Sequence, residues 1–139
     1  MNSAGVLLDT GPLVALLSKN DADHSRAKDL FSACVPPFRC CEAVLAEACF
    51  LMRKVDRAGP AEVIALGRNG VYQIALSAED HWSSIERLLQ KYSGQPISFA
   101  DACLIRCAEI HDEARILTFD SDFSVYRWSR NKQFDIVRS

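Results

Sequence analysis

Short apolar runs alternate with helix-like segments along this chain of 139 residues. The run at 6–8 ends at Asp9, and Thr10-Gly11-Pro12 then lead into a helical pattern at 13–17. Further strand-like runs are expected near 38–41, 71–76, 115–119 and 134–137. Helices are expected near 24–34, 42–54, 60–68, 78–92, 99–111 and 123–128. The helix at 42–54 is apolar nearly all round except at Glu47 and should be deeply packed, and Trp82 lies on the apolar stripe of the helix at 78–92. This alternation predicts an α/β fold, in which helices cover both faces of a central parallel sheet.

The length and composition fit one folded domain, which we expect to span 1–139. Hydrophobic residues make up 49% of the sequence and charged residues 24%, as in ordinary globular proteins. The longest apolar stretches are far shorter than the ~20 residues that cross a bilayer. No basic residue precedes Val6, and Asp9 interrupts the first apolar run, so a secretory signal is not indicated. We therefore expect a cytoplasmic protein without a membrane segment.

The six cysteines are expected to be reduced and mostly buried. None forms a C-x-x-C pair, and the three histidines are scattered, so a zinc site is disfavoured. Cys103 and Cys107 lie four residues apart on one face of a predicted apolar helix, where free cysteine behaves as a small hydrophobe.

The net charge of −2 argues against a protein that binds nucleic acid through a broad basic surface. Any contact with nucleic acid should be local. The C-terminal tail contains a basic group opposed only by Asp135. Its members are Arg127, Arg130, Lys132 and Arg138.

Four acidic residues occupy positions at which chemistry is expected. Asp9 and Asp120 each follow a predicted strand, and the carboxyl ends of parallel strands are where ligands bind in such sheets. Glu47 stands in a predicted apolar helix, where a charge needs an ionic partner or a metal. Asp101 begins another helix, three residues after Ser98, as in a capping box. Helix capping is the alternative role for the aspartates, and the helix N-terminus is expected to lower the pKa of Asp101.

Together, these acids are the ligands that a hard divalent cation requires. Clustered carboxylates repel each other and also repel phosphate, unless a metal ion lies between them. The sequence therefore favours Mg²⁺ or Mn²⁺, because Zn²⁺ would prefer His or Cys.

Four segments resemble the PIN-domain nucleases and, among them, the VapC toxins of type II toxin–antitoxin pairs. The segments 6–17, 44–47, 98–102 and 116–123 are similar to the family's four motifs in order and spacing. The resemblance implies a sheet of order 3-2-1-4-5. It also implies that Asp9, Glu47, Asp101 and Asp120 are catalytic metal-binding acids, with Asp122 as a helper metal ligand. Thr118, Thr10 and Ser98 would orient these carboxylates or water.

The same resemblance implies a Mg²⁺- or Mn²⁺-dependent endoribonuclease that hydrolyses RNA. It further implies a homodimer and a small cognate antitoxin that masks the acids with basic side chains. Apolar positions around Leu51, Ile64 and Leu66 are candidates for a dimer surface, with burial in the core as the alternative.

Two other classes of α/β protein also place an aspartate after their first strand. A haloacid-dehalogenase-like phosphatase needs a second Asp where Gly11 stands, and a receiver domain needs a second early acid and a late lysine; neither pattern is present. A housekeeping PIN nuclease without an antitoxin stays open. So does a catalytically inactive PIN-like module that binds RNA or protein.

Overall fold

Five short parallel strands form the central sheet, in the order β3-β2-β1-β4-β7. The computed structural model describes residues 5–138. The strands are β1 (Leu7–Leu8), β2 (Phe38–Cys40), β3 (Tyr72–Ile74), β4 (Arg115–Leu117) and β7 (Asp135–Ile136). The predicted order 3-2-1-4-5 is confirmed, because β7 is the fifth strand of the parallel sheet.

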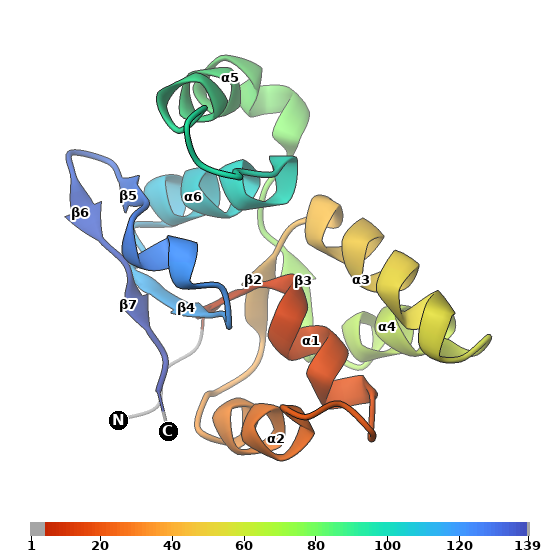
Figure 1. Cartoon of the computed structure of the whole chain (residues 1–139). Helices are drawn as coiled ribbons and strands as arrows, with labels where there is room; N and C mark the ends of the chain where they lie inside the picture. Colours follow the sequence, from red (N-terminus) through yellow and green to blue (C-terminus); the bar gives the residue numbers. More distant parts are fainter. Residues whose placement is uncertain (1–4, 139) are drawn as a thin grey trace.

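Six helices surround this sheet, as Figure 1 shows, with α5 and α6 on one side and α1, α2 and α4 on the other. The first three are α1 (Thr10–Leu17), α2 (His24–Ser32) and α3 (Glu42–Val55). The others are α4 (Gly59–Arg68), α5 (Trp82–Lys91) and α6 (Phe99–His111). Single 3-10 turns, η1 (Ala78–His81) and η2 (Ser121–Ser124), precede α5 and follow β4. The α/β class with helices on both faces is confirmed.

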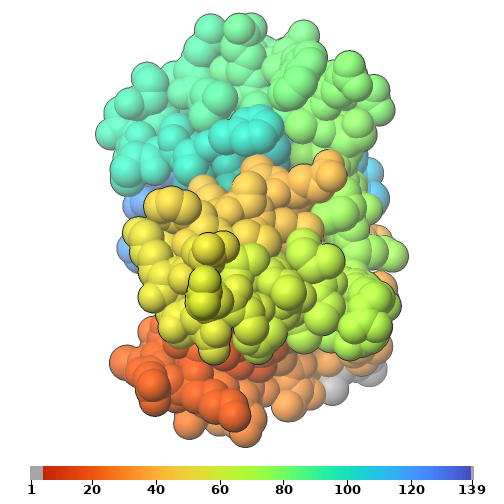
Figure 2. Space-filling view, turned by 90° about the vertical axis from the view of Figure 1, so that its right-hand side faces the viewer, coloured from red at the N-terminus to blue at the C-terminus, as the bar shows by residue number. Residues whose placement is uncertain are grey.

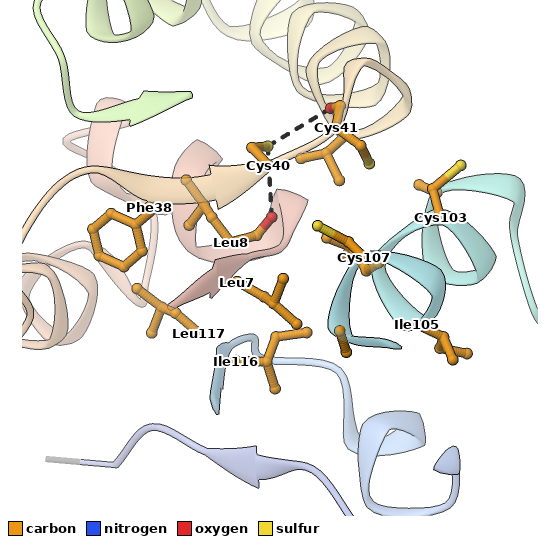
Figure 3. Packing of buried hydrophobic residues seen from close by; sticks show 14 of the residues in the cluster. Leu7, Leu8, Phe38, Cys40, Cys41, Cys103, Ile105, Cys107, Ile116 and Leu117 are labelled. Atoms are coloured by element: carbon orange, nitrogen blue, oxygen red, sulfur yellow. Dashed lines mark hydrogen bonds between the residues drawn. The ribbon is translucent and has the colours of Figure 1, made fainter. Parts of the chain in front are cut away.

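The core is formed by the sheet and by buried residues from all six helices. Leu7 and Leu8 are fully buried and pair in register with Ile116 and Leu117 of β4 (Figure 3). Every residue from Ala100 to Ile105 is buried, so α6 is the most enclosed helix of the described chain. Such strands need apolar residues on both faces, which explains why the sequence shows continuous apolar runs instead of alternation.

All six cysteines are free, and five of them are buried, as predicted. The Cys40 thiol donates to the Leu8 and Cys41 carbonyls, each at 3.7 Å (Figure 3). Burial is the main cause that raises the pKa of the Cys40 thiol well above its usual range. These thiols are packing groups, in keeping with the absence of a C-x-x-C pair.

Two helix predictions were wrong in detail. α3 was expected to be deeply packed, but Phe50 is 64% exposed and Val55 56% exposed. The reason is that α3 rests on its neighbours through one stripe of buried residues and turns its other apolar side chains outward. Trp82 was placed on the buried stripe of its helix, yet it is 57% exposed. It stands at the start of α5 and packs against Phe99 with ring centroids 6.5 Å apart.

The chain after β4 also differs from the prediction. A helix was expected near 123–128, but η2 ends at Ser124 and a small antiparallel hairpin follows, with strands β5 (Arg127–Trp128) and β6 (Lys132–Gln133). Ser129 and Asn131 in its turn have positive φ values of 49° and 63°. Tyr126 and Trp128 are both buried on this segment, and that two-residue spacing is a strand signal.

No helix within residues 5–138 has the length and apolar character needed to cross a membrane.

In Figure 2, α3 and α4 occupy the middle of the visible face, between α5 and α6 at the top and α1 and α2 at the bottom.

Candidate functional site

Three carboxylates meet at the carboxyl edge of the sheet. Asp9, Asp101 and Asp120 each offer one oxygen, and these oxygens lie within 4.8 Å of one another. Asp9 directly follows β1, and Asp120 lies three residues beyond β4, the parallel neighbour of β1. The N-terminal end of α6 brings Asp101 to the same place. The parallel pairing of β1 with β4 and the start of α6 therefore bring together acids that are up to 111 residues apart in the sequence.

Asp9 is held by two donors inside the protein. Its Oδ1 accepts from the Thr10 N–H at 2.8 Å and its Oδ2 from the Thr118 hydroxyl at 2.6 Å. The side chain is 7% exposed. Burial raises the pKa of Asp9 to about 6, against the lowering effect of these hydrogen bonds, and the charges of Asp101 and Asp120 add to the rise. Asp9 thus caps α1, which is one of the roles considered from the sequence, and it also faces the other two aspartates.

Asp101 completes the capping box at the start of α6. Its N–H donates to the Ser98 hydroxyl at 3.0 Å, and its Oδ2 accepts from the Ser98 N–H at 3.2 Å. The Tyr126 hydroxyl donates to the same Oδ2 at 3.2 Å. The helix N-terminus was expected to lower the pKa of Asp101, and this expectation was wrong. Burial, reinforced by the charge of Asp120, raises the pKa above its usual value because it outweighs the hydrogen bonds.

Glu47 reaches the acids from α3. Its Oε2 accepts from the Thr10 hydroxyl at 3.1 Å, and its side chain lines the same pocket as the three aspartates. The expectation that Glu47 is enclosed in apolar surroundings was wrong, because its residue is exposed at the rim. It forms no ion pair with any residue that the structure describes, so the Thr10 hydroxyl is what orients it.

Asp120 and Asp122 have different positions. The Asp120 N–H donates to the Thr118 hydroxyl at 3.0 Å, and its Oδ1 accepts from the Asp122 N–H at 2.9 Å. Thr118 therefore contacts both Asp9 and Asp120. Asp122 does not line the acid pocket, and its pKa is raised by partial burial and by the charge of Asp120. The structure brings Asp9, Glu47, Asp101 and Asp120 around one pocket and leaves Asp122 outside its lining.

The pocket between these side chains, which we call the acid pocket, has a volume of about 420 Å³. The four acids share its lining with these residues: Thr10, Gly11, Leu51, Pro96, Ser98 and Phe119. Within the described chain, no Lys or Arg lines it, so no cationic side chain of the lining offsets the charge of the carboxylates. An all-oxygen donor set with uncompensated negative charge fits Mg²⁺ or Mn²⁺.

Sequence reasoning missed Tyr126 as part of the site. Its ring is fully buried and packs edge-on against Phe123 at 5.1 Å and Tyr92 at 5.0 Å, which fixes the hydroxyl next to Asp101. The one available signal was that a buried tyrosine needs a hydrogen-bond partner for its hydroxyl. No local motif connects residue 126 with residue 101.

Comparisons with known proteins agree with this architecture. The chain is similar in fold to VapC20 of Mycobacterium tuberculosis, a sarcin–ricin loop cleaving toxin. The match has a TM-score of 0.76 and 22% sequence identity, and it covers 92% of this chain and 99% of the VapC20 chain. No curated protein sequence matches the chain. The family model of the PIN domain matches residues 6–128, which is most of the sequence, and the chain therefore belongs to the PIN-domain family.

Proposed function

We propose that this protein is a metal-dependent endoribonuclease that hydrolyses RNA phosphodiester bonds in the cytoplasm. One observation carries this proposal: oxygens of three carboxylates lie within 4.8 Å of one another. A fourth acid lines the same pocket, and no cationic side chain of the described residues does. Membership of the PIN-domain family supports it. A divalent cation and a phosphate can share such a pocket, whereas phosphate alone would be repelled.

Asp9, Asp101 and Asp120 would hold Mg²⁺ or Mn²⁺, and Glu47 would complete the site from the rim. When bound, the ion would activate water for in-line attack and stabilise the charge that develops on the phosphate. Asp122 is the weakest candidate as a ligand. Its N–H donates to Asp120, so we assign it the role of orienting that carboxylate.

The protein's own groups keep the acids in place for this chemistry. Thr118 donates to Asp9 and accepts from the backbone of Asp120, and Thr10 donates to Glu47. Ser98 and Tyr126 hold Asp101 through its backbone and side chain. Each carboxylate therefore enters the reaction already oriented, which is how outer hydrogen-bond partners strengthen metal sites.

We further propose that the enzyme is the toxin of a VapBC-type toxin–antitoxin pair. The fold likeness to VapC20, which covers 92% of this chain and 99% of the VapC20 chain, supports this assignment. The small cognate antitoxin would mask the acids with basic side chains.

A homodimer is part of the same proposal. Four apolar side chains are exposed along α3 and α4, which form the middle of the face in Figure 2. They are Phe50, Leu51, Val55 and Ile64. Apolar side chains gathered on neighbouring helices indicate an interaction surface, and a second copy of the chain is the occupant that we propose. Light scattering of the purified protein tests this, and a monomer at micromolar concentration would contradict it.

The activity is tested with purified, antitoxin-free protein. The substrates are total RNA and an oligonucleotide that carries the sarcin–ricin loop, because VapC20 is a toxin that cleaves this loop. We expect cleavage in Mg²⁺ or Mn²⁺, none in EDTA and none by an Asp101→Asn variant with an intact fold.

The result separates this proposal from its alternatives. Cleavage that survives EDTA or the Asp101→Asn substitution would exclude the assigned site. Failure of the folded wild-type protein to cut any RNA would favour the inactive binding module. Metal-dependent cutting by a protein that no small partner inhibits would favour a housekeeping nuclease.

A further inference from the structure

A second pocket adjoins the acid pocket and has the opposite character. Its volume is about 240 Å³, and it shares Phe119 and Asp120 with the acid pocket as common walls. The residues that give it this character carry guanidinium and hydroxyl groups. They are Arg26, Arg138, Ser121 and Ser124. We call this space the arginine pocket. Phe119 and Asp120 are therefore the residues at which the two pockets adjoin.

Arg26 is positioned by an aromatic ring. Its guanidinium carbon lies 4.3 Å from the centroid of the Phe119 ring. Stacking on a ring face leaves the in-plane N–H donors of a guanidinium free for a planar or tetrahedral anion. Its contact with Asp23, at 3.8 Å, joins two side chains that are about half exposed, so it holds the arginine only weakly.

Arg138 is the member of the basic tail that reaches this pocket. Arg127 instead donates to the carbonyls of Ser124, Val125 and Tyr126 at 2.9–3.0 Å. The Lys132 Nζ lies 3.6 Å from the Asp112 Oδ1 and 4.6 Å from the centre of the Trp128 ring. Neither Arg127 nor Lys132 lines the arginine pocket.

Arg130 lines neither the acid pocket nor the arginine pocket. The tail was recognised in the sequence as a basic group, and the structure places Arg138 alone of its four cations beside the acids.

We propose that the arginine pocket binds the phosphate next to the scissile phosphate of a single RNA strand. The inference rests on the proposed nuclease function, and it adds the direction in which the strand leaves the acids. Two guanidinium groups and the Ser121 hydroxyl are donors suited to phosphate oxygens, whereas the Ser124 hydroxyl already donates to the Ser121 carbonyl at 2.6 Å. An RNA strand carries a phosphate on each side of the scissile one, and the two pockets adjoin at Phe119 and Asp120, so they suit neighbouring phosphates of one strand.

The net charge of −2 explains why this contact matters. A protein without a broad basic surface must bind an anionic strand through a few local cations, and the acids themselves oppose binding. Removal of these arginines should therefore weaken RNA binding and reduce its dependence on salt, since fewer counterions are released.

The test compares Arg26→Gln, Arg138→Gln and the double variant with a matched control, Arg68→Gln. Arg68 is exposed at the end of α4, near β3, at the edge of the sheet opposite to β7. Cleavage of a fluorogenic single-stranded RNA in Mg²⁺ is measured at several salt concentrations. We expect the double variant to raise KM about tenfold with kcat within twofold, and to reduce the slope of log(kcat/KM) against log[salt] by about one. The control should behave as wild type.

A binding assay keeps this inference separate from the proposed function. Fluorescence anisotropy of a short labelled RNA, in Ca²⁺ without turnover, should show about tenfold weaker binding by the double variant than by Arg68→Gln. Equal RNA binding by these two proteins would overturn the inference even if the enzyme is an active nuclease. An acidic peptide used as a second probe provides the opposing outcome: loss of peptide binding with RNA binding unchanged would assign the pocket to a protein partner. Absence of cleavage by wild type would count against the nuclease, whereas the anisotropy result would still decide on the pocket.

Discussion

Asp9 shows at the scale of one residue how the proposed active site opposes stability. The carboxylate is buried, and its pKa is about 6 instead of the usual 3.8. A raised pKa means that the folded protein prefers the protonated acid. The stability associated with protonated Asp9 is fully present below pH 3.8 and is lost as the pH rises through about 6. At neutral pH without metal, the ionised Asp9 therefore destabilises the fold.

We predict that Asp9→Asn stabilises the metal-free protein at pH 7.5. Asn retains the acceptor that caps α1 and removes the buried charge. The pKa difference corresponds to on the order of 1–3 kcal/mol in the free energy of unfolding. Urea denaturation in EDTA measures it. The advantage of the variant should disappear towards pH 4, where Asp9 is protonated, and an advantage that does not change with pH would contradict this explanation.

Thr118 is the residue that links two of the acids, and its hydroxyl should tune metal affinity. Thr118→Val keeps the shape but removes the donor to Asp9 and the acceptor for the Asp120 N–H. We expect the Mg²⁺ concentration for half-maximal cleavage to rise about 10–100-fold, as for other partners of metal ligands. The Mg²⁺-induced increase in thermal stability should shrink in parallel.

Thr118→Ser is the matched control, because it keeps the hydroxyl and removes only a methyl group. Its requirement for Mg²⁺ should stay close to that of wild type. If the valine and serine variants need the same Mg²⁺ concentration for half-maximal cleavage, the hydroxyl does not affect metal binding and only stabilises the backbone at the end of the strand.

At the scale of elements, strand ends could be predicted from the sequence but side-chain partners across elements could not. Asp9 was located because an apolar run stops at it, and Asp101 because Ser98 stands three residues earlier. Both signals are local. The contact of Tyr126 with Asp101, and the reach of Arg26 from α2 to Phe119, depend on how distant elements pack.

The wrong predictions have the same origin. Hydrophobic periodicity shows which side chains avoid water, but not whether a neighbouring element covers them. Apolar residues such as Phe50 and Val55 therefore indicated a buried helix, although α3 has buried residues on only one stripe. The β5–β6 hairpin was missed because its strands have two residues each, too few to establish a period.

The packing of α3 against α4 depends on one glycine. A Cβ atom at Gly59 would lie 2.5 Å from the Met52 carbonyl oxygen, which is backbone and cannot rotate away. We predict that Gly59→Ala pushes the helices apart and lowers the free energy of unfolding by about 1–3 kcal/mol. Chemical denaturation measures the loss.

Gly94→Ala is the control for this prediction, because nothing lies within 4 Å of the Cβ atom it would add. Its stability should be within about 0.5 kcal/mol of wild type. Equal effects of the two substitutions would mean that the close approach of α3 and α4 is not what Gly59 provides.

At the scale of the whole molecule, the site joins parts of the chain that are brought together only by folding. The three aspartates come from the end of β1, the start of α6 and the segment after β4. An ion bound to all three would bind the folded chain and not the unfolded one, because only folding assembles its ligands. Binding free energy then becomes folding free energy.

We therefore predict that Mg²⁺ raises the thermal stability of the protein and that the increase depends on pH. At 100 times its Kd, a ligand of the folded state adds about 2.7 kcal/mol, which corresponds to a rise in Tm of several degrees for a domain of this size. The ion needs ionised carboxylates, and protons compete for Asp9 with a pKa of about 6. The Tm increase should be large at pH 7.5, small at pH 5 and lost in Asp101→Asn. An equal Tm increase at both pH values would show that the ion binds elsewhere. A site that includes Asp9 must release the proton of this acid between pH 5 and pH 7.5 before the metal binds.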